Sequence, residues 1–245
     1  MRVAYLTITG ALALTATVAG GRAWAQSPAA TASPAPQAAP APAGSSAQPG
    51  AEPVDVVIVE EDVVAPLIGE PEHHFRHALK YFQKGKKKQA ADEISIGAAL
   101  VRLEAGRHAA ENKGGLQKAA DDLDKLADDV RQGKVTSPKP LERTFAQADL
   151  ALARHYQKMA KNSLSQADGK KTGGWLAASA DYLERGAGWV GHKFEAGEAA
   201  VVRGARTLGQ KLKGGASTAS GDVSKGVDDL GNEVDKLDGS QASAK

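Results

Sequence analysis

The sequence predicts an all-α protein: an antiparallel bundle of about four helices at residues 71–168, followed by a long amphipathic C-terminal helix. Apolar residues recur at helical spacings from residue 75 onward. Only 4% of the 245 residues are aromatic, so the core must be packed largely with alanine, leucine and valine, which favours helices over a β-sandwich. One strand-like run, residues 54–68, has no second run to pair with after the leader.

Residues 1–25 have the features of a secretory signal peptide. Arg2 precedes an apolar run at residues 3–18, and Ala23-Trp24-Ala25 fits a cleavage site, so we expect cleavage before Gln26. Removal of this leader leaves 29 basic and 29 acidic side chains, which argues against nucleic acid as a partner. The chain has no cysteine, which excludes a disulfide scaffold and a cysteine-ligated metal. We therefore expect a periplasmic or secreted protein.

Two segments separate the leader from the helices. Residues 26–53 consist mainly of Ala, Pro, Ser, Thr, Gln and Gly, a composition that predicts a disordered linker. It would space the protein from a wall or membrane, or serve only as an export spacer. Residues 54–70 are β-branched and acidic, with seven carboxylates and no lysine or arginine at residues 52–72. We expect an extended arm that lies on the helices.

The bundle itself is predicted from four apolar stripes with breaks between them. The first helix begins at Pro71 and stops at Gly85, and the second runs over residues 87–111. Gly114-Gly115 precedes the third helix, Gly133 ends it, and Ser137 is the expected N-cap of the fourth. The stripes comprise Phe75, Ala78, Leu79 and Phe82; Ala91, Ile94, Ala98, Val101 and Ala105; Leu116, Ala119, Leu123, Leu126 and Val130; Leu141, Phe145, Ala148, Leu152, Tyr156 and Met159. Short turns favour antiparallel neighbours, and residues 71–168 are expected to fold independently.

The first two helices resemble the helix-turn-helix of a single tetratricopeptide repeat through Ala78, Tyr81, Gly85, Ala90 and Ile94, within residues 75–101. Such a repeat would imply a peptide-binding array. The pattern does not recur one repeat length further along the chain, so we interpret it as an ordinary αα-hairpin.

Residues 170–213 carry an eleven-residue apolar period, in the series Val190, Val201 and Leu212 and in Leu183, Phe194 and Ala205. This period predicts one straight stripe on a long helix. The segment resembles the amphipathic helices of apolipoproteins and late-embryogenesis-abundant proteins, which implies a helix that binds a surface or folds on a partner. Its net charge of +4 and the aromatic residues Trp175, Tyr182 and Trp189 favour a protein partner or an anionic membrane surface for residues 174–212. For the first half of the segment, a fifth helix packed on the protein's own bundle is favoured over a surface helix. Residues 214–245 are expected to be weakly helical or disordered.

Candidate sites are few. The sequence lacks the serine-hydrolase, phosphate-loop and His-Glu-x-x-His motifs, and we assign no catalytic residue. His73 and His77 lie one helical turn apart and could share a zinc, copper or nickel ion. A third ligand would come from His108 or His155.

These observations predict an exported, non-enzymatic helical protein that acts as an envelope-associated interaction module or as a structural, stress-related module. The alternative is a periplasmic transition-metal-binding bundle that uses the His73/His77 cluster. An enzyme site assembled from several helices is a further open alternative.

Overall fold

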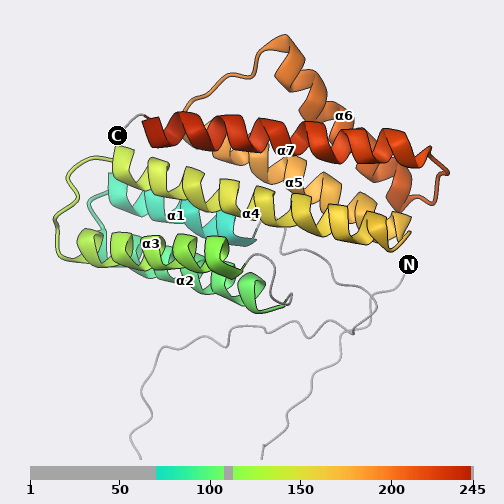
Figure 1. Ribbon diagram of the computed structural model, residues 1–245. Coiled ribbons are helices and arrows are strands. Elements are labelled where there is room, and N and C mark those ends of the chain that lie inside the picture. Colours follow the sequence, from blue (N-terminus) through green and yellow to red (C-terminus); the bar gives the residue numbers. More distant parts are fainter. Residues whose placement is uncertain (1–69, 108–112, 244–245) are drawn as a thin grey trace, which may run out of the picture. The chain divides into compact units, whose positions relative to one another are not determined.

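The computed structural model describes residues 70–107 and 113–243, and 85% of these residues are helical (Figure 1). The described part contains seven helices and no strand, which confirms the predicted all-α class. The expected leader, linker and arm, and His108, lie outside the described residues. The helices are α1 (Glu70–Gln83), α2 (Lys87–Arg107), α3 (Lys113–Arg131), α4 (Lys139–Ser165), α5 (Gly169–Trp189), α6 (Ala196–Lys213) and α7 (Ser220–Ser243).

The apolar stripes predicted for the first four helices form the core between them. Phe75, Ile94, Leu123 and Phe145 are all fully buried. The turns from α1 to α2 and from α3 to α4 place Gly85 and Gly133 in the left-handed region, with φ of 72° and 76°. Glycine adopts this conformation without the steric cost of a Cβ atom, so it ends both helices.

The N-cap predicted for α4 was wrong by one residue. Pro138, not Ser137, occupies the cap position, with φ −70° and no side-chain hydrogen bond. The proline ring holds φ near its helical value and brings no N–H group that a cap would have to satisfy. The helix therefore starts at Lys139 without the side-chain cap that Ser137 was expected to provide.

The long helix α4 is shared between two groups of helices. It contacts α1 and α3, which precede it in the sequence, and α5 and α7, which follow it. Each helix also packs against the next one in the sequence. α5 therefore packs along α4, across the boundary that we expected between residues 71–168 and 170–213.

The single long helix expected over residues 170–213 was also wrong. α5 ends at Trp189 and α6 begins at Ala196. Gly191 has φ 67°, and the His192 N–H donates to the Ala187 carbonyl at 2.9 Å, which closes α5 in a Schellman-type cap. Glu195 and Glu198 then form a capping box that starts α6. The eleven-residue series thus falls on two helices.

α5 and α6 approach each other most closely at two glycines. A Cβ atom on Gly173 would lie 2.5 Å from the Gly209 carbonyl oxygen, and one on Gly209 would lie 2.6 Å from the Gly173 carbonyl oxygen. Side chains at either position would separate the helix backbones. The two glycines therefore set the distance between α5 and α6.

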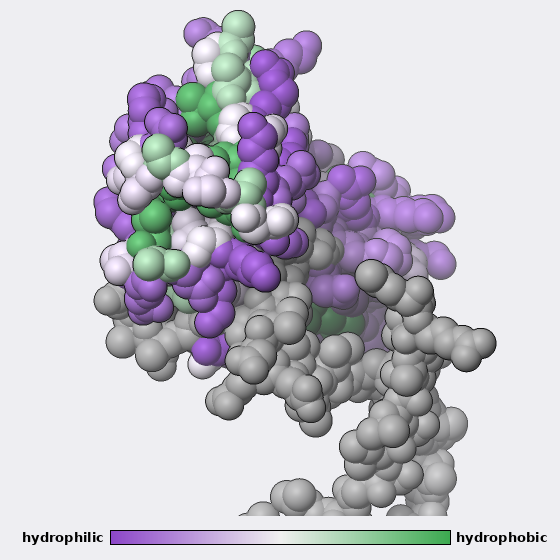
Figure 2. All heavy atoms as spheres, turned by 90° about the vertical axis from the view of Figure 1, so that its right-hand side faces the viewer, coloured by the Kyte–Doolittle hydropathy of each residue, from purple (hydrophilic) through white to green (hydrophobic). Residues whose placement is uncertain are grey.

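Residues 220–243 belong to the segment that we expected to be weakly helical or disordered, but they form the regular helix α7, which packs on α4. α7 buries Val223, Val227, Leu230, Val234 and Leu237. On α4, Arg154 donates to Asp235 at 2.6 Å and to Asp238 at 2.9 Å. Figure 2 shows the end of the molecule where α4 turns into α5 and α6 into α7, and hydrophilic residues border a smaller hydrophobic area there.

Candidate functional site

A groove lies between α1 and α5, close to the buried Asp149. Its volume is about 600 Å³. We call it the α1–α5 groove. It is lined by Glu72, Arg76, Leu79, Lys80 and Gln83 from α1 and by Glu184, Arg185, Gly188 and Trp189 from α5.

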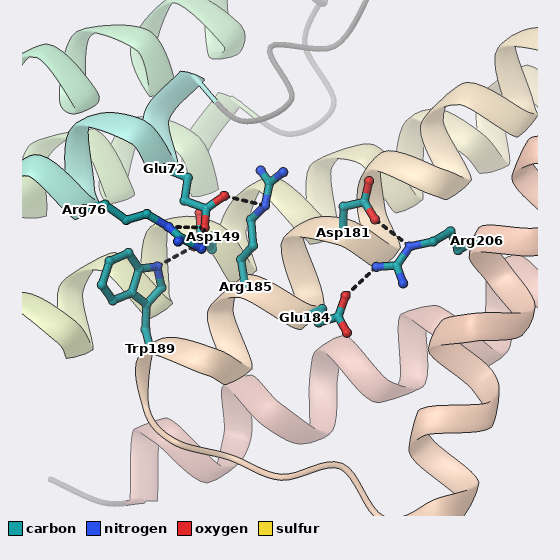
Figure 3. A network of polar contacts seen from close by, with 8 residues as sticks. All are labelled: Glu72, Arg76, Asp149, Asp181, Glu184, Arg185, Trp189 and Arg206. Atoms are coloured by element: carbon teal, nitrogen blue, oxygen red, sulfur yellow. Dashed lines mark hydrogen bonds and ion pairs between the residues drawn. The ribbon is translucent and has the colours of Figure 1, made fainter.

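One carboxylate in this groove holds two arginines. Arg76 Nε donates to Glu72 Oε1 at 2.8 Å, and Arg185 Nε lies 2.8 Å from Glu72 Oε2. In Figure 3 the terminal nitrogens of Arg185 lie away from Glu72. Arg185 Nη1 is buried and has no hydrogen-bond partner among the described residues. Glu72 therefore binds the Arg185 guanidinium through Nε, and Nη1 is left without an acceptor among the described residues.

Asp149 on α4 lies next to this network and is fully buried. Trp189 Nε1 donates to Asp149 Oδ2 at 2.9 Å (Figure 3). Asp149 Oδ1 has no hydrogen-bond partner among the described residues. Burial raises the pKa of the Asp149 carboxyl well above its usual value, and the Trp189 hydrogen bond and the Arg185 charge oppose this shift only partly.

The groove carries more positive than negative charge. Arg76, Lys80 and Arg185 line it against the carboxylates of Glu72 and Glu184. Glu184 is in turn paired with Arg206 of α6, which also binds Asp181 at 2.7 Å (Figure 3). Both carboxylates of the groove are thus already engaged by protein cations.

Trp189, which lines the groove, packs against aromatic rings of the core. Phe75 of α1 stacks on Phe145 of α4 with ring centroids 4.6 Å apart, and Phe145 contacts Trp189 edge to face at 5.2 Å. Trp189 itself is partly buried. The indole therefore contacts the core, binds Asp149 and lines the groove at the same time.

The other two aromatic residues of α5 face the interior. Trp175 and Tyr182 are buried, and both stack on Tyr156 of α4 with centroids 5.5 Å apart. The aromatic row that we expected beside a surface stripe is thus largely used in packing α5 on α4. Of this row, Trp189 is the member that lines the groove.

A second buried polar group lies between α2 and α4. Glu104 Oε1 is 3.8 Å from His155 Nε2, and both side chains are buried. Desolvation raises the pKa of Glu104, a shift that the neighbouring Tyr156 hydroxyl and the Arg107 charge partly oppose, and desolvation also raises the pKa of Tyr156. His155 is therefore part of the core with Glu104 and Tyr156.

The predicted histidine pair is brought together on α1. The rings of His73 and His77 have centroids 4.1 Å apart. His155, one of the two expected third ligands, is engaged with Glu104 instead, and His108 lies outside the described residues. In the part of the chain that the structure describes, no three histidine, aspartate or glutamate side chains are grouped so as to enclose an ion.

Sequence reasoning singled out Trp189 and Leu79 but missed the charged residues of the groove and the buried Asp149 beside them. One signal was present, because Asp149 lies four residues after Phe145 and therefore falls on the predicted apolar face of α4. A carboxylate on such a face indicates a buried polar contact. Glu72 and Arg185 gave no such signal, since they are more than a hundred residues apart.

Among the described helices, none has both the length and the apolar character needed to cross a membrane. Comparison of the chain with models of protein families, with curated proteins and with solved structures finds no match.

Proposed function

We propose that this chain is an exported, non-enzymatic interaction module that binds a carboxylate-bearing segment of a partner protein in the α1–α5 groove. The observation that carries the proposal is Arg185. Its Nε is held by Glu72 at 2.8 Å while its buried Nη1 has no partner in the described residues. A buried donor without an acceptor costs free energy, and a partner carboxylate that binds the 21% exposed Arg185 side chain and displaces the groups covering Nη1 would supply the missing acceptor.

The surroundings of Arg185 suit such a ligand. Arg76 and Lys80 add positive charge beside it, and the groove's own carboxylates are already paired. Leu79 and Trp189 supply apolar surface in the same groove. Tryptophan and arginine are the residues that most often dominate binding energy at protein interfaces. An acidic segment with an apolar side chain therefore matches the groove best.

The role of the other parts follows from their sequence. A leader at residues 1–25 would direct the chain to the periplasm or the exterior, and a Pro/Ala linker at residues 26–53 would separate the helical body from its attachment. Amino-terminal sequencing of the protein from its native cells should give Gln26, and an intact Met1 on a cytosolic protein would contradict export.

Photo-crosslinking tests the position of the binding site. Because the chain has no native cysteine, Gln83→Cys at the groove and Lys118→Cys on α3 each accept one photoreactive maleimide. Incubated with envelope extract, the groove probe should give a defined adduct that the probe on α3 does not. Adding Arg185→Gln to the groove probe should remove the adduct. Identical adducts from both positions would contradict the proposal.

Competition tests the chemistry of the ligand. Short peptides that alternate glutamate with phenylalanine should suppress the adduct at low salt, and lysine–phenylalanine peptides of equal length should not. Arg185→Gln should weaken binding of the acidic peptide about ten- to hundredfold, since hydrogen bonds to charged groups contribute about 1.5–3 kcal/mol. Arg131→Gln is the matched control, because Arg131 is an exposed arginine paired with Asp128 on α3. Equal losses in the two variants would exclude the groove.

A further inference from the structure

We infer that α1 carries a second site that is independent of the α1–α5 groove, in which the adjacent imidazoles of His73 and His77 bind a divalent transition-metal ion. The two residues are one turn apart, and their ring centroids are 4.1 Å apart with an angle of 54° between the rings. His73 is exposed, and the His77 side chain is 42% exposed. An ion from solvent can therefore reach both rings.

Glu93 of α2 hydrogen-bonds His74 and lies near His77. Its Oε2 is 2.7 Å from His74 Nδ1, and its Oε1 is 3.7 Å from His77 Nδ1. A carboxylate beside Nδ1 favours the tautomer that carries the proton on this nitrogen, which leaves the Nε2 lone pair for a metal. Ligating histidines in metalloproteins commonly have such a carboxylate as their second contact. At 3.7 Å the contact of Glu93 with His77 is too long for a hydrogen bond, so Glu93 favours a proton on His77 Nδ1 through its charge alone, which leaves Nε2 for a metal.

The ligand set determines which ions bind. Two imidazoles provide neutral nitrogen donors, which suit copper(II), nickel(II) and zinc(II) better than magnesium or calcium. For such a nitrogen site, copper(II) is bound most tightly of the three. Because no third protein ligand is grouped with the pair in the described residues, water completes the coordination sphere. The site is open and exchanges its ion with solvent.

A bound ion links two turns of α1. Since the ligand geometry requires the helical conformation at residues 73–77, binding favours the folded chain over the unfolded chain. The thermal midpoint of unfolding should therefore rise with metal concentration. This effect belongs to α1 and does not depend on a ligand in the groove.

Calorimetry on the processed chain, prepared without a polyhistidine tag, tests the site with CuCl₂, NiCl₂ and ZnCl₂. The double variant His73→Ala, His77→Ala should bind each ion at least about tenfold more weakly. His192→Ala is the matched control, because His192 is a partly exposed histidine that also faces a carboxylate, Glu198, at 3.4 Å. It should bind like the native chain. Circular dichroism without metal verifies that all variants are folded.

Two results would overturn the inference. Equal affinity in the native chain and the double variant would exclude His73 and His77 as ligands, and so would an equal loss in His192→Ala. Broadening of histidine ring signals in NMR by substoichiometric Cu²⁺ provides the independent readout: signals of His73 and His77 should broaden first and those of His192 last. Glu93→Gln should lower the affinity about tenfold, and unchanged affinity would overturn the role assigned to Glu93.

Discussion

At Asp149, burial and charge act in opposite directions. The side chain is fully buried on the core face of α4, and its Oδ1 has no partner among the described residues. Loss of water around the carboxylate raises its pKa more than Trp189 and Arg185 lower it. The folded protein therefore holds this proton to a higher pH than the unfolded chain does.

Asp149→Asn should raise the free energy of unfolding at pH 7. A raised folded pKa gives a stability contribution that is complete below the unfolded value, about pH 3.9, and is lost as pH rises toward the folded pKa. Asparagine cannot lose a proton, and its carbonyl oxygen can still accept from Trp189 Nε1. The stability gained through the substitution should decrease as pH is lowered, by no more than about 1.4 kcal/mol per pH unit, and should approach zero near pH 4.

Urea denaturation at pH 4, 5.5 and 7 measures this effect. Asp122→Asn on α3 is the control, because Asp122 is an exposed aspartate paired with Lys118. Parallel pH profiles for the native chain and the Asp149→Asn variant would show that Asp149 is not protonated in the folded state.

The residues of the core could be predicted because helical periodicity is local. The charged residues of the groove could not, because their contacts depend on how distant helices pack. Leu123, Phe145 and Leu152 are buried because one helix repeats apolar side chains on one face, and this repeat is visible in the sequence. The contact of Glu72 with Arg185 depends on how distant helices pack. The His73–His77 contact is local to one helix, so its spacing was sufficient to predict it.

At the scale of elements, the break between α5 and α6 explains why an apolar period misled the prediction. Eleven-residue spacing marked side chains that are buried or half-buried, but it does not report whether the helix is continuous between them. Leu183 and Ala205 are indeed both buried, on different helices. The local signals that divide them are Gly191 and the capping box of Glu195 with Glu198.

Gly209→Ala should destabilise the protein by about 1–3 kcal/mol, because the added Cβ would lie 2.6 Å from the Gly173 carbonyl oxygen and force α5 and α6 apart. Gly204→Ala lies on the same helix with no neighbouring atom within 4 Å. It should stabilise by about 0.5–1 kcal/mol, since alanine favours the helix over the unfolded chain. Urea unfolding of both variants gives the signs. A gain in both would mean that the helices are not in backbone contact there.

At the scale of the whole molecule, α4 joins the two groups of helices into one cooperative unit. Its side facing α5 carries Tyr156, which stacks on Trp175 and Tyr182, and Leu150, which lies near Gly186. Ser179 Oγ of α5 also donates to the Ala153 carbonyl at 2.7 Å. This interface leads us to expect that residues 71–168 do not fold independently of α5.

A fragment of residues 70–168 should therefore lose cooperative unfolding. Exposure of a large buried side chain costs about 1.5–3 kcal/mol, and a folded domain is stable by only about 5–15 kcal/mol. Residues 70–245 should melt in one transition by circular dichroism, whereas the fragment should lose helicity gradually and bind the dye ANS. A sharp transition in the fragment would restore the smaller bundle as a folding unit.

The pattern of helix contacts also has a consequence for the folding rate. Each helix packs on its successor, so most contacts join residues that are close in the sequence, and such chains reach their native topology quickly. The contacts of α4 with α7 and of α1 with α5 are exceptions, because Arg154 and Asp238 are 84 residues apart and Glu72 and Arg185 are further apart still. Closing the loop between α4 and α7 costs more entropy than forming any neighbouring hairpin, and we expect α7 to dock last. Until α7 docks, the apolar surface against which Leu230 and Val234 pack in the native state is exposed to solvent. A chaperone would act at this late step.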